Sequence, residues 1–345
     1  MRKLRAVVAV GAATLLLSMA ACSGSDDKAP ASNAQNAAAG PLEKVTYMSG
    51  FGLFGRESYV YAAIDKGYFR DAGLDVEVKP GLGTNPNLKA LSSGAVQYAS
   101  IDLTGAFLEY GRPGGINDFT IVGAVQQRSL TALMALEESG ISTPRDLENK
   151  TIGAQPGSVN QVLFPTYARL AGIDAKKVKF QNVAPQQQPQ LLASKKVDVI
   201  TQFPVGKPGV ERAAGGKKAV VLPYTDVITD LFGGAIGVSK KTAQEKPDQV
   251  KRFMTALLKG LSDTINNPQE AGQIYAKFEK TQPPPVAAAE MTLMRPYVDL
   301  GSGLGQIDQA RAARSIAILQ GAGAIPDGLK PEDVISFSLI PKPSA

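Results

Sequence analysis

The stretch AAIDKGYFRDAGLDVEVKPG, residues 62–81, passes from a helical pattern to a strand pattern within a few residues. Its first part continues a helix expected from Tyr59 to Gly67, because a glycine after the last periodic residue is a typical stop signal. After a short helical turn, apolar residues alternate with charged ones over 74–79, which is typical of a half-exposed strand. A helix that leads directly into a strand favours an α/β fold.

Candidate strands and helices alternate on both sides of this stretch. Strands are expected at 44–48, 98–101, 121–125, 130–136, 151–154, 178–183 and 197–201, and helices at 85–93, 161–171 and 186–194. This alternation predicts an α/β fold with largely parallel sheets. The segments 88–101 and 191–201 both consist of a helix, a polar turn and a buried strand, which indicates two lobes. From residue 245 amphipathic helical patterns dominate, so the C-terminal third is predicted to be mostly helical.

The N-terminus has the pattern of an export signal. Three basic residues precede the apolar run 6–17, which is too short to span a bilayer of roughly 30 Å. Small residues then precede Cys22, the only cysteine, in an arrangement that resembles the bacterial lipobox, although Met19 replaces the usual leucine. We therefore predict a signal peptide over 1–21, a lipid such as palmitate on Cys22, and a flexible tether over 22–41. An ordinary secretory signal with an incidental cysteine is the alternative.

Composition argues against several classes of function. The chain has no histidine and a single cysteine, so the commonest acid–base group is missing and metal sites built from histidine and cysteine are impossible. Removal of residues 1–21 lowers the net charge from +6 to about +3, and no basic run is interleaved with aromatic residues, so nucleic acid is not an expected partner. GSGLG (301–305) lacks the preceding strand that a dinucleotide fingerprint needs. We expect no cofactor, no metal and no catalysis.

Four segments in order resemble the extracytoplasmic solute-binding proteins of the nitrate, sulfonate and taurine transporter class, which includes binders of thiamine-precursor pyrimidines. The segments are 62–81, TPRDLENKTIGAQPGSVN (143–160), LLASKKVDVITQFP (191–204) and KPDQVKRFMTALLKGLSDTINNPQEA (246–271). One departure is Gln97, which follows Ser-Gly-Ala-Val where that class usually has an aspartate. Asp198 keeps the pattern in the second lobe.

The resemblance implies a two-lobed periplasmic-binding-protein-like fold of type II with a ligand cleft between the lobes. Lobe one is expected over 42–132 with a return over 233–345, and lobe two over 133–232. The crossings near 129–134 and 233–238 are expected to act as hinges. It also implies a monomer that captures a small molecule at the extracytoplasmic face of the membrane and works with an ABC permease and its ATPase.

Ligands of open α/β sheets bind outside the carboxyl ends of the strands. On that basis the ligand-binding residues are predicted to be Phe51, Phe54, Glu57, Tyr59, Asn85, Asp102, Thr104, Gln127, Gln155, Ser158, Asn160, Gln202 and Phe203. Structural alternatives exist for several of them, since the two residues Phe51 and Phe54 also suit a core and the serine, threonine and aspartate also suit helix caps. Arg56 and Gln126 are neighbours for which a solvated, capping or hinge position is the expectation.

The expected function is a lipid-anchored receptor of an ABC importer for a small organic solute, either a sulfonate, a pyrimidine precursor or a related organic acid. A secreted enzyme on the same fold is one alternative. A lipoprotein with a sensory or structural role is another.

Overall fold

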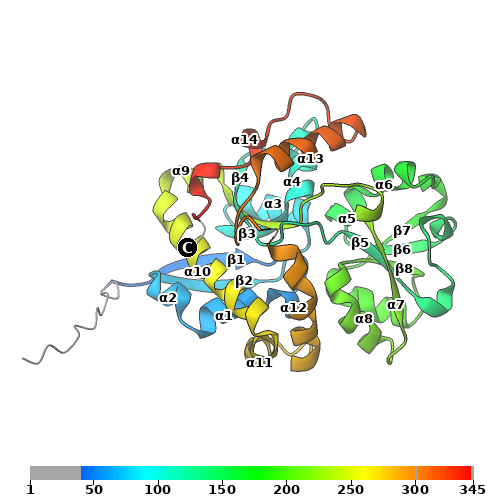
Figure 1. Ribbon diagram of the computed structural model, residues 1–345, viewed down its shortest axis with the longest axis horizontal. Coiled ribbons are helices and arrows are strands. Elements are labelled where there is room, and N and C mark those ends of the chain that lie inside the picture. The colour runs from blue at the N-terminus through cyan, green and yellow to red at the C-terminus, as the bar shows by residue number, and fades with distance from the viewer. Residues whose placement is uncertain (1–39, 300, 343–345) are drawn as a thin grey trace, which may run out of the picture. The chain divides into compact units, whose positions relative to one another are not determined.

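The computed structural model describes residues 40–299 and 301–342, which belong to one compact unit. The predicted signal peptide, Cys22 and nearly all of the predicted tether lie outside the described residues. Within the described part, the strands form two five-stranded sheets with helices on their faces (Figure 1). We call each sheet, together with its helices, a lobe.

Lobe one is built on a sheet of order β2-β1-β3-β10-β4. Its strands are β1 (Glu43–Met48), β2 (Leu74–Lys79), β3 (Tyr98–Asp102), β4 (Phe119–Ala124) and β10 (Gly234–Ser239). Strand β1 runs parallel to β2 and β3, whereas β10 runs antiparallel to both β3 and β4. Residues 62–81 thus form helical turns followed by the edge strand β2.

Lobe two is built on a sheet of order β7-β6-β8-β5-β9. Its strands are β5 (Ala132–Leu136), β6 (Thr151–Ala154), β7 (Lys179–Asn182), β8 (Val199–Gln202) and β9 (Ala219–Pro223). Strand β6 runs parallel to β7 and β8, and β5 runs antiparallel to β8 and β9. In each lobe, therefore, the antiparallel strand is the first one after the chain crosses over from the other lobe.

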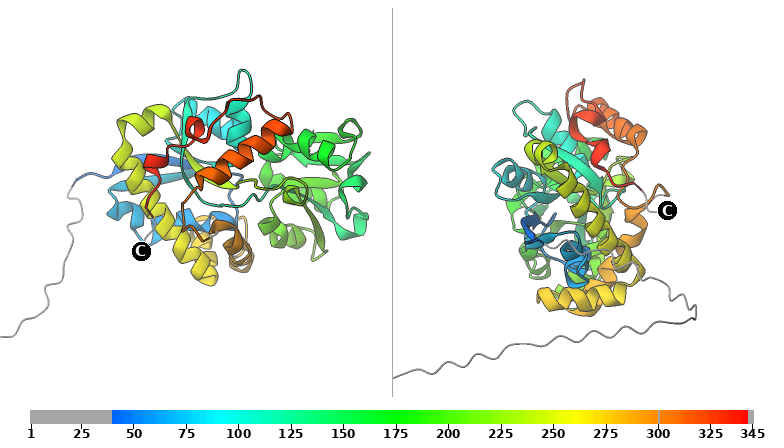
Figure 2. Two further views of the ribbon diagram at one scale, coloured as in Figure 1. Left: turned by 45° about the horizontal axis from the view of Figure 1, so that its top comes forward. Right: turned by 90° about the vertical axis from the view of Figure 1, so that its left-hand side faces the viewer.

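Helices cover both faces of each sheet (Figure 2). In lobe one they are α1 (Ser58–Asp65), α2 (Tyr68–Asp71), α3 (Thr84–Ser92), α4 (Leu103–Gly111), α9 (Lys240–Glu245), α10 (Pro247–Asn266), α11 (Pro268–Phe278), α12 (Pro284–Val298), α13 (Gln309–Gly321) and α14 (Pro331–Val334). In lobe two they are α5 (Val159–Val162), α6 (Phe164–Leu170), α7 (Gln188–Ala193) and α8 (Lys207–Ala213). No helix in the described part of the chain is both long enough and apolar enough to span a membrane.

The alternation of side chains along the strands of lobe one creates two cores. Along β4, Ile121 joins the core shared with α3, α4 and α13, and Val122 joins the opposite core with α1, α10 and α12. The second core centres on Phe253 of α10, whose ring stacks on the ring of Tyr98 with centroids 3.7 Å apart. The amphipathic pattern of residues 246–261 thus becomes the face of α10 that packs on the sheet.

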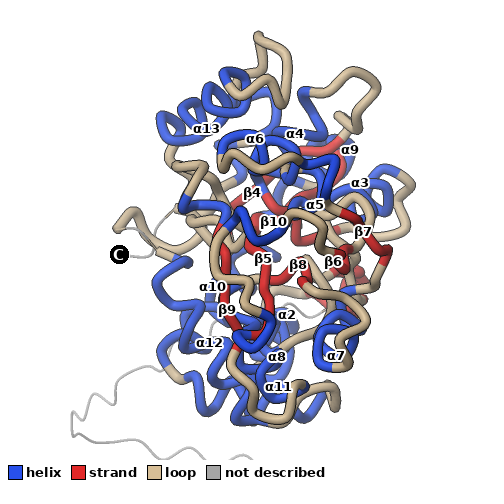
Figure 3. The backbone as a smooth tube through the Cα atoms, turned by 90° about the vertical axis from the view of Figure 1, so that its right-hand side faces the viewer, coloured by secondary structure: helices blue, strands red, loops and turns tan. Residues whose placement is uncertain are grey.

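Two crossing segments connect the lobes, one over residues 125–131 and the other over 224–233. They run side by side, because the backbone N–H of Ser129 donates to the carbonyl of Leu231 and that of Tyr224 donates to the carbonyl of Thr131. Figure 3 shows the strands β4, β5, β9 and β10 that lead into and out of the crossings. The crossings are thus a hydrogen-bonded pair of segments, and the second of them begins with a 3-10 turn at Tyr224–Asp226.

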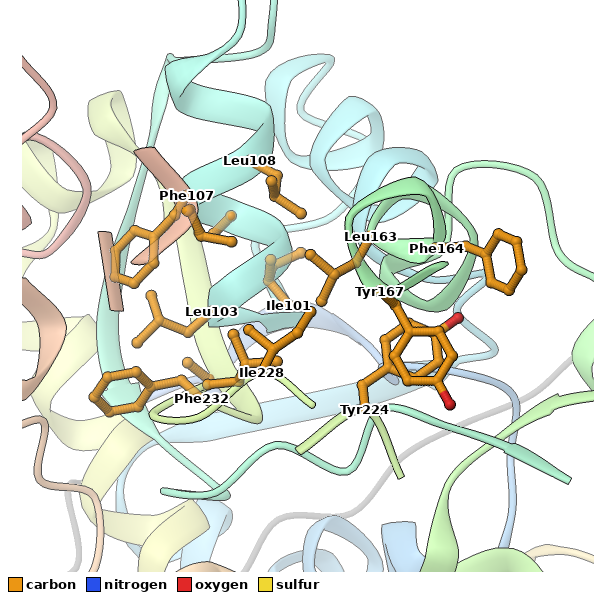
Figure 4. Close-up of a cluster of buried hydrophobic side chains, with 14 of the residues drawn as sticks. Ile101, Leu103, Phe107, Leu108, Leu163, Phe164, Tyr167, Tyr224, Ile228 and Phe232 are labelled. Atoms are coloured by element: carbon orange, nitrogen blue, oxygen red, sulfur yellow. The ribbon is translucent and has the colours of Figure 1, made fainter. Parts of the chain in front are cut away.

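One apolar core extends from lobe one into lobe two. Leu103 and Phe107 of α4 belong to the same buried cluster as Leu163 and Tyr167 from the α5–α6 region. Figure 4 shows these side chains between the helices, with the ring of Tyr167 stacked on that of Tyr224 at a centroid distance of 4.1 Å. The lobes are therefore in apolar contact where α4 faces the α5–α6 region.

The α/β prediction is confirmed, and four details of it need correction. Each sheet is mixed rather than largely parallel, with two parallel and two antiparallel strand pairs, and β9 was not predicted. The helix expected over 161–171 is divided into α5 and α6, and the one expected over 186–194 begins with a 3-10 turn at Pro185–Gln187. The lobe boundaries at 132/133 and 232/233 stay a prediction.

Candidate ligand-binding site

A small cavity lies where loops of both lobes meet, with a volume of about 40 Å³. Lobe one contributes the loops that follow β1, β2 and β3, and lobe two contributes the loops that follow β6 and β8. These are the carboxyl ends of the parallel strands, where open α/β sheets bind ligands. The cavity holds only a few water molecules, so an organic solute needs the lobes to move apart before it can enter.

Arg56 forms one wall of the cavity. Its guanidinium lies 4.4 Å from the ring centroid of Phe54 and 5.0 Å from that of Phe203, and its Nη2 donates to the carbonyl of Phe51 at 2.9 Å. Nη1 also forms a buried ion pair with Glu290 of α12, at 3.5 Å from Oε2. The charge of Arg56 is thus held by a carboxylate that does not line the cavity.

Glu57 lines the cavity beside Arg56 and is buried. The hydroxyls of Tyr59 and Tyr47 donate to its Oε2 at 3.0 and 3.3 Å, and they lie 2.7 Å from each other. Burial raises the pKa of Glu57 from 4.5 to about 7, although Arg56 and the two tyrosines act in the opposite direction. Near neutral pH this carboxyl group therefore accepts hydrogen bonds when ionised and donates one when protonated.

Asp102 is the second carboxyl group of the cavity and stands at the end of β3. Its Oδ1 accepts from the backbone N–H of Gly105 at 2.9 Å and so caps α4. Burial raises its pKa from 3.8 to about 7, because the backbone N–H groups of Gly105 and Thr104 offset the loss of water only in part. The capping alternative is therefore realised, and the residue also lines the cavity.

Five polar side-chain atoms of cavity-lining residues are buried without a hydrogen-bond partner among the described residues. They are Arg56 Nε and Nη1 and Thr84 Oγ1 in lobe one, and Ser158 Oγ and Asn160 Oδ1 in lobe two. Ser158 precedes α5, yet its hydroxyl makes no capping bond. A buried polar atom without a partner costs about 1–3 kcal/mol, so these atoms indicate where a bound molecule would find hydrogen bonds.

The lobes approach closely beside this cavity. The backbone N–H of Asn85 donates to the carbonyl of Gly157 across the interface at 3.1 Å. Gly83 has φ +102° and Gly157 has φ +73°, and a Cβ on Gly157 would lie 3.0 Å from the Cβ of Asn85. On the other side, the rings of Phe51 and Phe203 lie 5.5 Å apart. The glycines allow a backbone-to-backbone contact that a side chain would obstruct.

Six of the predicted ligand-binding residues line the cavity, and their role as ligand contacts stays a prediction. They are Phe51, Glu57, Asp102, Ser158, Asn160 and Phe203. They come from segments up to 152 positions apart in the sequence, and the fold brings them together. The arginine at position 56 also lines the cavity, although the expectation for it was a solvated or capping position.

The other seven predicted residues lie away from this cavity. Phe54 and Gln202 line a neighbouring groove. The hydroxyl of Tyr59 donates to Glu57, although Tyr59 itself does not line the cavity. The side-chain amide of Asn85 donates to Glu109 at 2.9 Å. The hydroxyl of Thr104 exchanges hydrogen bonds with the backbone of Phe232, and Gln155 bonds to the carbonyl of the next residue.

Gln127, the seventh, is turned to the opposite side from its neighbour Gln126. Its Nε2 donates to the carbonyl of Gly303 at 2.7 Å, in the segment between α12 and α13. Gln126 instead lines the cavity and its Oε1 accepts from the N–H of Gly234 at 2.9 Å. The two glutamines are adjacent in the sequence but contact different parts of lobe one, so the sequence did not show which of them reaches the cavity.

The polar groups that line the cavity are carboxylate, amide, hydroxyl and guanidinium groups. Across the described residues no three histidine, cysteine, aspartate or glutamate side chains are grouped so as to hold a metal ion. The arrangement offers hydrogen bonds and aromatic walls, which suits the binding of a small polar molecule.

Comparison with known proteins gives relatives that bind small molecules. A sequence model of the family described as NMT1/THI5 like matches residues 57–271. The riboflavin-binding protein RibY of Chloroflexus aurantiacus is 27% identical over 285 residues, which cover 81% of this chain and 79% of that protein. The formylaminopyrimidine-binding protein of Halalkalibacterium halodurans is 24% identical over 216 residues, which cover 62% of this chain and 64% of that protein.

Solved structures share the fold at low sequence identity. The alkanesulfonate-binding protein SsuA of Xanthomonas axonopodis pv. citri has a TM-score of 0.67 at 15% identity and covers 87% of this chain and 100% of its own. The desulfurization enzyme DSZB has a TM-score of 0.54 at 12% identity, with coverage of 86% and 97%. The expected fold of periplasmic binding proteins is thereby confirmed, and it is a fold that also occurs in an enzyme.

Proposed function

The chain belongs to the NMT1/THI5-like family, and from this membership together with the cavity we propose that it is the substrate-binding protein of an ABC importer. It captures a small organic solute between its lobes and delivers it to a membrane permease that an ATPase drives. The relatives named for riboflavin and for formylaminopyrimidine support a solute of this size class.

The observation that carries the proposal is the convergence of unpartnered polar atoms from both lobes on one cavity. A solute that bonds to Thr84 in lobe one and to Ser158 and Asn160 in lobe two can make all of these contacts only when the lobes are closed. Such a solute stabilises the closed state by its differential affinity for it. The paired crossings are the segments at which the lobes would rotate.

Attachment to the membrane is a further part of the proposal. Cys22 carries the lipid at the end of the tether 22–41 after removal of 1–21, which places a monomeric binding protein at the extracytoplasmic face of the membrane. Metabolic labelling with a lipid precursor tests this, since the wild-type protein should incorporate label and Cys22→Ala should not. Equal labelling of the two proteins would reject the anchor.

Native mass spectrometry of the purified mature protein tests the binding function directly. We expect a co-purified organic molecule that dissociates on unfolding and that, when added back, raises the melting temperature by mass action. The molecule should be recovered unchanged after prolonged incubation. A protein whose melting temperature responds to no fraction of a bacterial metabolite extract would speak against a binding function and for a structural role.

An enzyme on the same fold is the second candidate, and one observation favours it. Glu57 and Asp102 line one cavity and burial raises the pKa of each to about 7, which are values suited to general acid–base catalysis at neutral pH. Conversion of the co-purified molecule to a product, lost in Glu57→Gln, would establish catalysis and exclude simple transport.

A further inference from the structure

The guanidinium of Arg56 brings hydrogen-bond donors to the cavity that the protein itself does not use. Nη2 donates to the carbonyl of Phe51 at 2.9 Å, whereas Nε and Nη1 are buried without a hydrogen-bond partner among the described residues. The ion pair of Nη1 with Glu290, at 3.5 Å, balances the charge but supplies no hydrogen bond. A guanidinium only donates, so a molecule that reaches these atoms has to offer an acceptor.

Asn160 presents the opposite polarity. Its Nδ2 donates to the carbonyls of Ala132 and Gln202, at 2.7 and 3.4 Å, and these carbonyls accept only, which assigns the amide nitrogen to the protein side. Oδ1 is therefore the atom left without a partner, and it is fully buried. An amide oxygen only accepts hydrogen bonds, so its partner in a bound molecule has to be an N–H or O–H group.

The other polar side chains of the cavity can adapt to either polarity. The hydroxyls of Thr84 and Ser158 both donate and accept. Glu57 and Asp102 each receive hydrogen bonds from the protein, and with pKa values of about 7 each of them exchanges a proton near neutral pH. Among the cavity-lining side chains with unpartnered buried atoms, only Arg56 and Asn160 therefore have a fixed polarity.

The two groups of fixed polarity belong to different lobes and line one small space. Arg56 follows β1 of lobe one, Asn160 belongs to α5 of lobe two, and the cavity that both line has a volume of about 40 Å³. An acceptor and a donor that reach both groups in the closed state therefore have to lie close together in one compact unit. A carbonyl beside an N–H, as in an amide, lactam or ureide, has this composition, and Phe51 and Phe203 provide apolar surface next to it.

Resting on the proposed function, we propose that the cleft binds a solute with an amide, lactam or ureide unit whose carbonyl oxygen accepts from Arg56 in lobe one and whose N–H donates to Asn160 in lobe two. The fixed polarity of these two groups sets the orientation of the solute across the cleft. A solute that has only acceptors satisfies Arg56 but leaves Oδ1 of Asn160 buried without a partner, so it stabilises the closed state less.

Isothermal titration at pH 7.5 with matched probes tests the inference. The pairs are uracil with 1,3-dimethyluracil and lumichrome with 1,3-dimethyllumichrome, in which methylation removes the N–H groups and keeps the carbonyl oxygens. We expect at least one parent compound to bind, with a Kd roughly tenfold or more below that of its methylated partner. A methylated compound that binds as tightly as its parent, or the failure of both parents to bind, would overturn the inference.

Variants of the two residues separate the donor contact from the acceptor contact. Asn160→Ala should weaken the binding of the parent roughly tenfold and leave that of the methylated partner almost unchanged. Arg56→Lys keeps a positive charge opposite Glu290 but lacks Nε, and should weaken both members of a pair by a similar factor, because both retain the carbonyl oxygens. The opposite pattern, or equal losses for both members in Asn160→Ala, would contradict the orientation.

The matched control is Gln188→Ala, which removes a fully buried amide side chain of lobe two that does not line the cavity. It should preserve the discrimination between parent and methylated probe, and its loss in this control would contradict the assignment to Asn160. A melting curve of each variant identifies any that does not fold. The comparison of the probe pairs on the wild-type protein decides the inference independently of the variants.

The outcome for the inference and for the proposed function can be separated. If the molecule that co-purifies with the protein has no carbonyl beside an N–H, the binding function stands and the inference fails. If a parent probe binds with the expected discrimination and is chemically converted, the recognition stands and the transport function fails.

Discussion

Arg311 and Leu231 are joined by a hydrogen bond of 2.9 Å from the guanidinium Nη2 to the carbonyl oxygen. The same guanidinium donates to the carbonyl of Gln127 and lies 4.1 Å from the ring centroid of Phe232. Leu231 belongs to the crossing 224–233 and Gln127 to the crossing 125–131. One side chain of α13 therefore holds both crossings, and the C-terminal helices brace the predicted hinge.

Arg311→Gln should loosen this brace. Hydrogen bonds to charged groups contribute about 1.5–3 kcal/mol, so we expect amide hydrogen exchange in both crossings to accelerate by roughly tenfold or more. Exchange is measured by mass spectrometry on peptides that cover 125–131 and 224–233. The matched control is Arg314→Gln, since Arg314 pairs with the same Asp230 side chain of the second crossing but, unlike Arg311, does not donate to the backbone carbonyls of Gln127 and Leu231. Equal exchange rates in the two variants would show that Arg311 does not stabilise the two crossings.

Gly157→Ala should hinder closure of the lobes. The added Cβ meets Asn85 across the interface, and the φ of +73° strains any alanine by about 1 kcal/mol. Gly140→Ala is the control, because its φ of +72° imposes the same strain and nothing lies within 4 Å of the new Cβ. Both variants should lose similar stability, whereas only Gly157→Ala should increase the radius of gyration in small-angle X-ray scattering. An unchanged radius would show that the contact does not limit closure.

Stability should fall as the pH rises through the range set by Glu57. Its pKa is about 7 in the folded protein against 4.5 ordinarily, so the folded state holds the proton more tightly than the unfolded state. The stabilisation is complete below about pH 4.5 and is lost by about pH 7, a change of about 3 kcal/mol. Asp102 acts in the same direction, since burial raises its pKa also.

Urea denaturation between pH 4.5 and 8 measures this dependence, and Glu57→Gln should reduce its slope, with the contribution of Asp102 remaining. Glu138→Gln is the comparison, because Lys217 and Lys195 lower the pKa of the exposed Glu138 and its contribution is lost only at more acidic pH. A slope that is the same in wild type and Glu57→Gln would contradict the buried-carboxyl explanation.

Phe253→Ala should destabilise lobe one by about 3–5 kcal/mol, because the ring is fully buried and stacks on Tyr98 and Phe69. Phe278→Ala removes a ring that stacks on Tyr61 at 4.9 Å but is 40% exposed, and should cost about 1 kcal/mol. Denaturant titrations of the two variants provide the comparison. Equal losses would mean that the α10 interface is not the centre of this core.

Local pattern was sufficient for most elements of the fold. The strand at 151–154 has the bounds predicted for it, and the alternation over 74–79 identified β2. The strand β9 was missed because AVVLP is a short apolar run beside two lysines, and such a run does not distinguish strand from loop or helix. The antiparallel strands could not be derived from pattern either, because direction in a sheet is set by the crossings.

The cavity was only partly predictable, because its geometry depends on distant pairs. Loops after strands pointed to Phe51, Asp102 and Asn160, which line the cavity. Arg56 was left out of the predicted contacts, and its ion-pair partner Glu290 lies 234 positions further along the chain. Thr84 was missed as well, because its place in the lining of a cavity that loops of both lobes form is not marked by any local pattern.

The place of β10 in the first sheet has a consequence for the order of folding. Strands β3 and β4 are not neighbours, and the gap between them is filled by residues 234–239, which follow all of lobe two in the sequence. As the chain emerges, lobe two can complete its sheet from a continuous segment, whereas lobe one has two open strand edges that are prone to wrong pairing. The half of the site that holds Glu57 and Asp102 is therefore the last to be assembled, although its sequence is the first to be made.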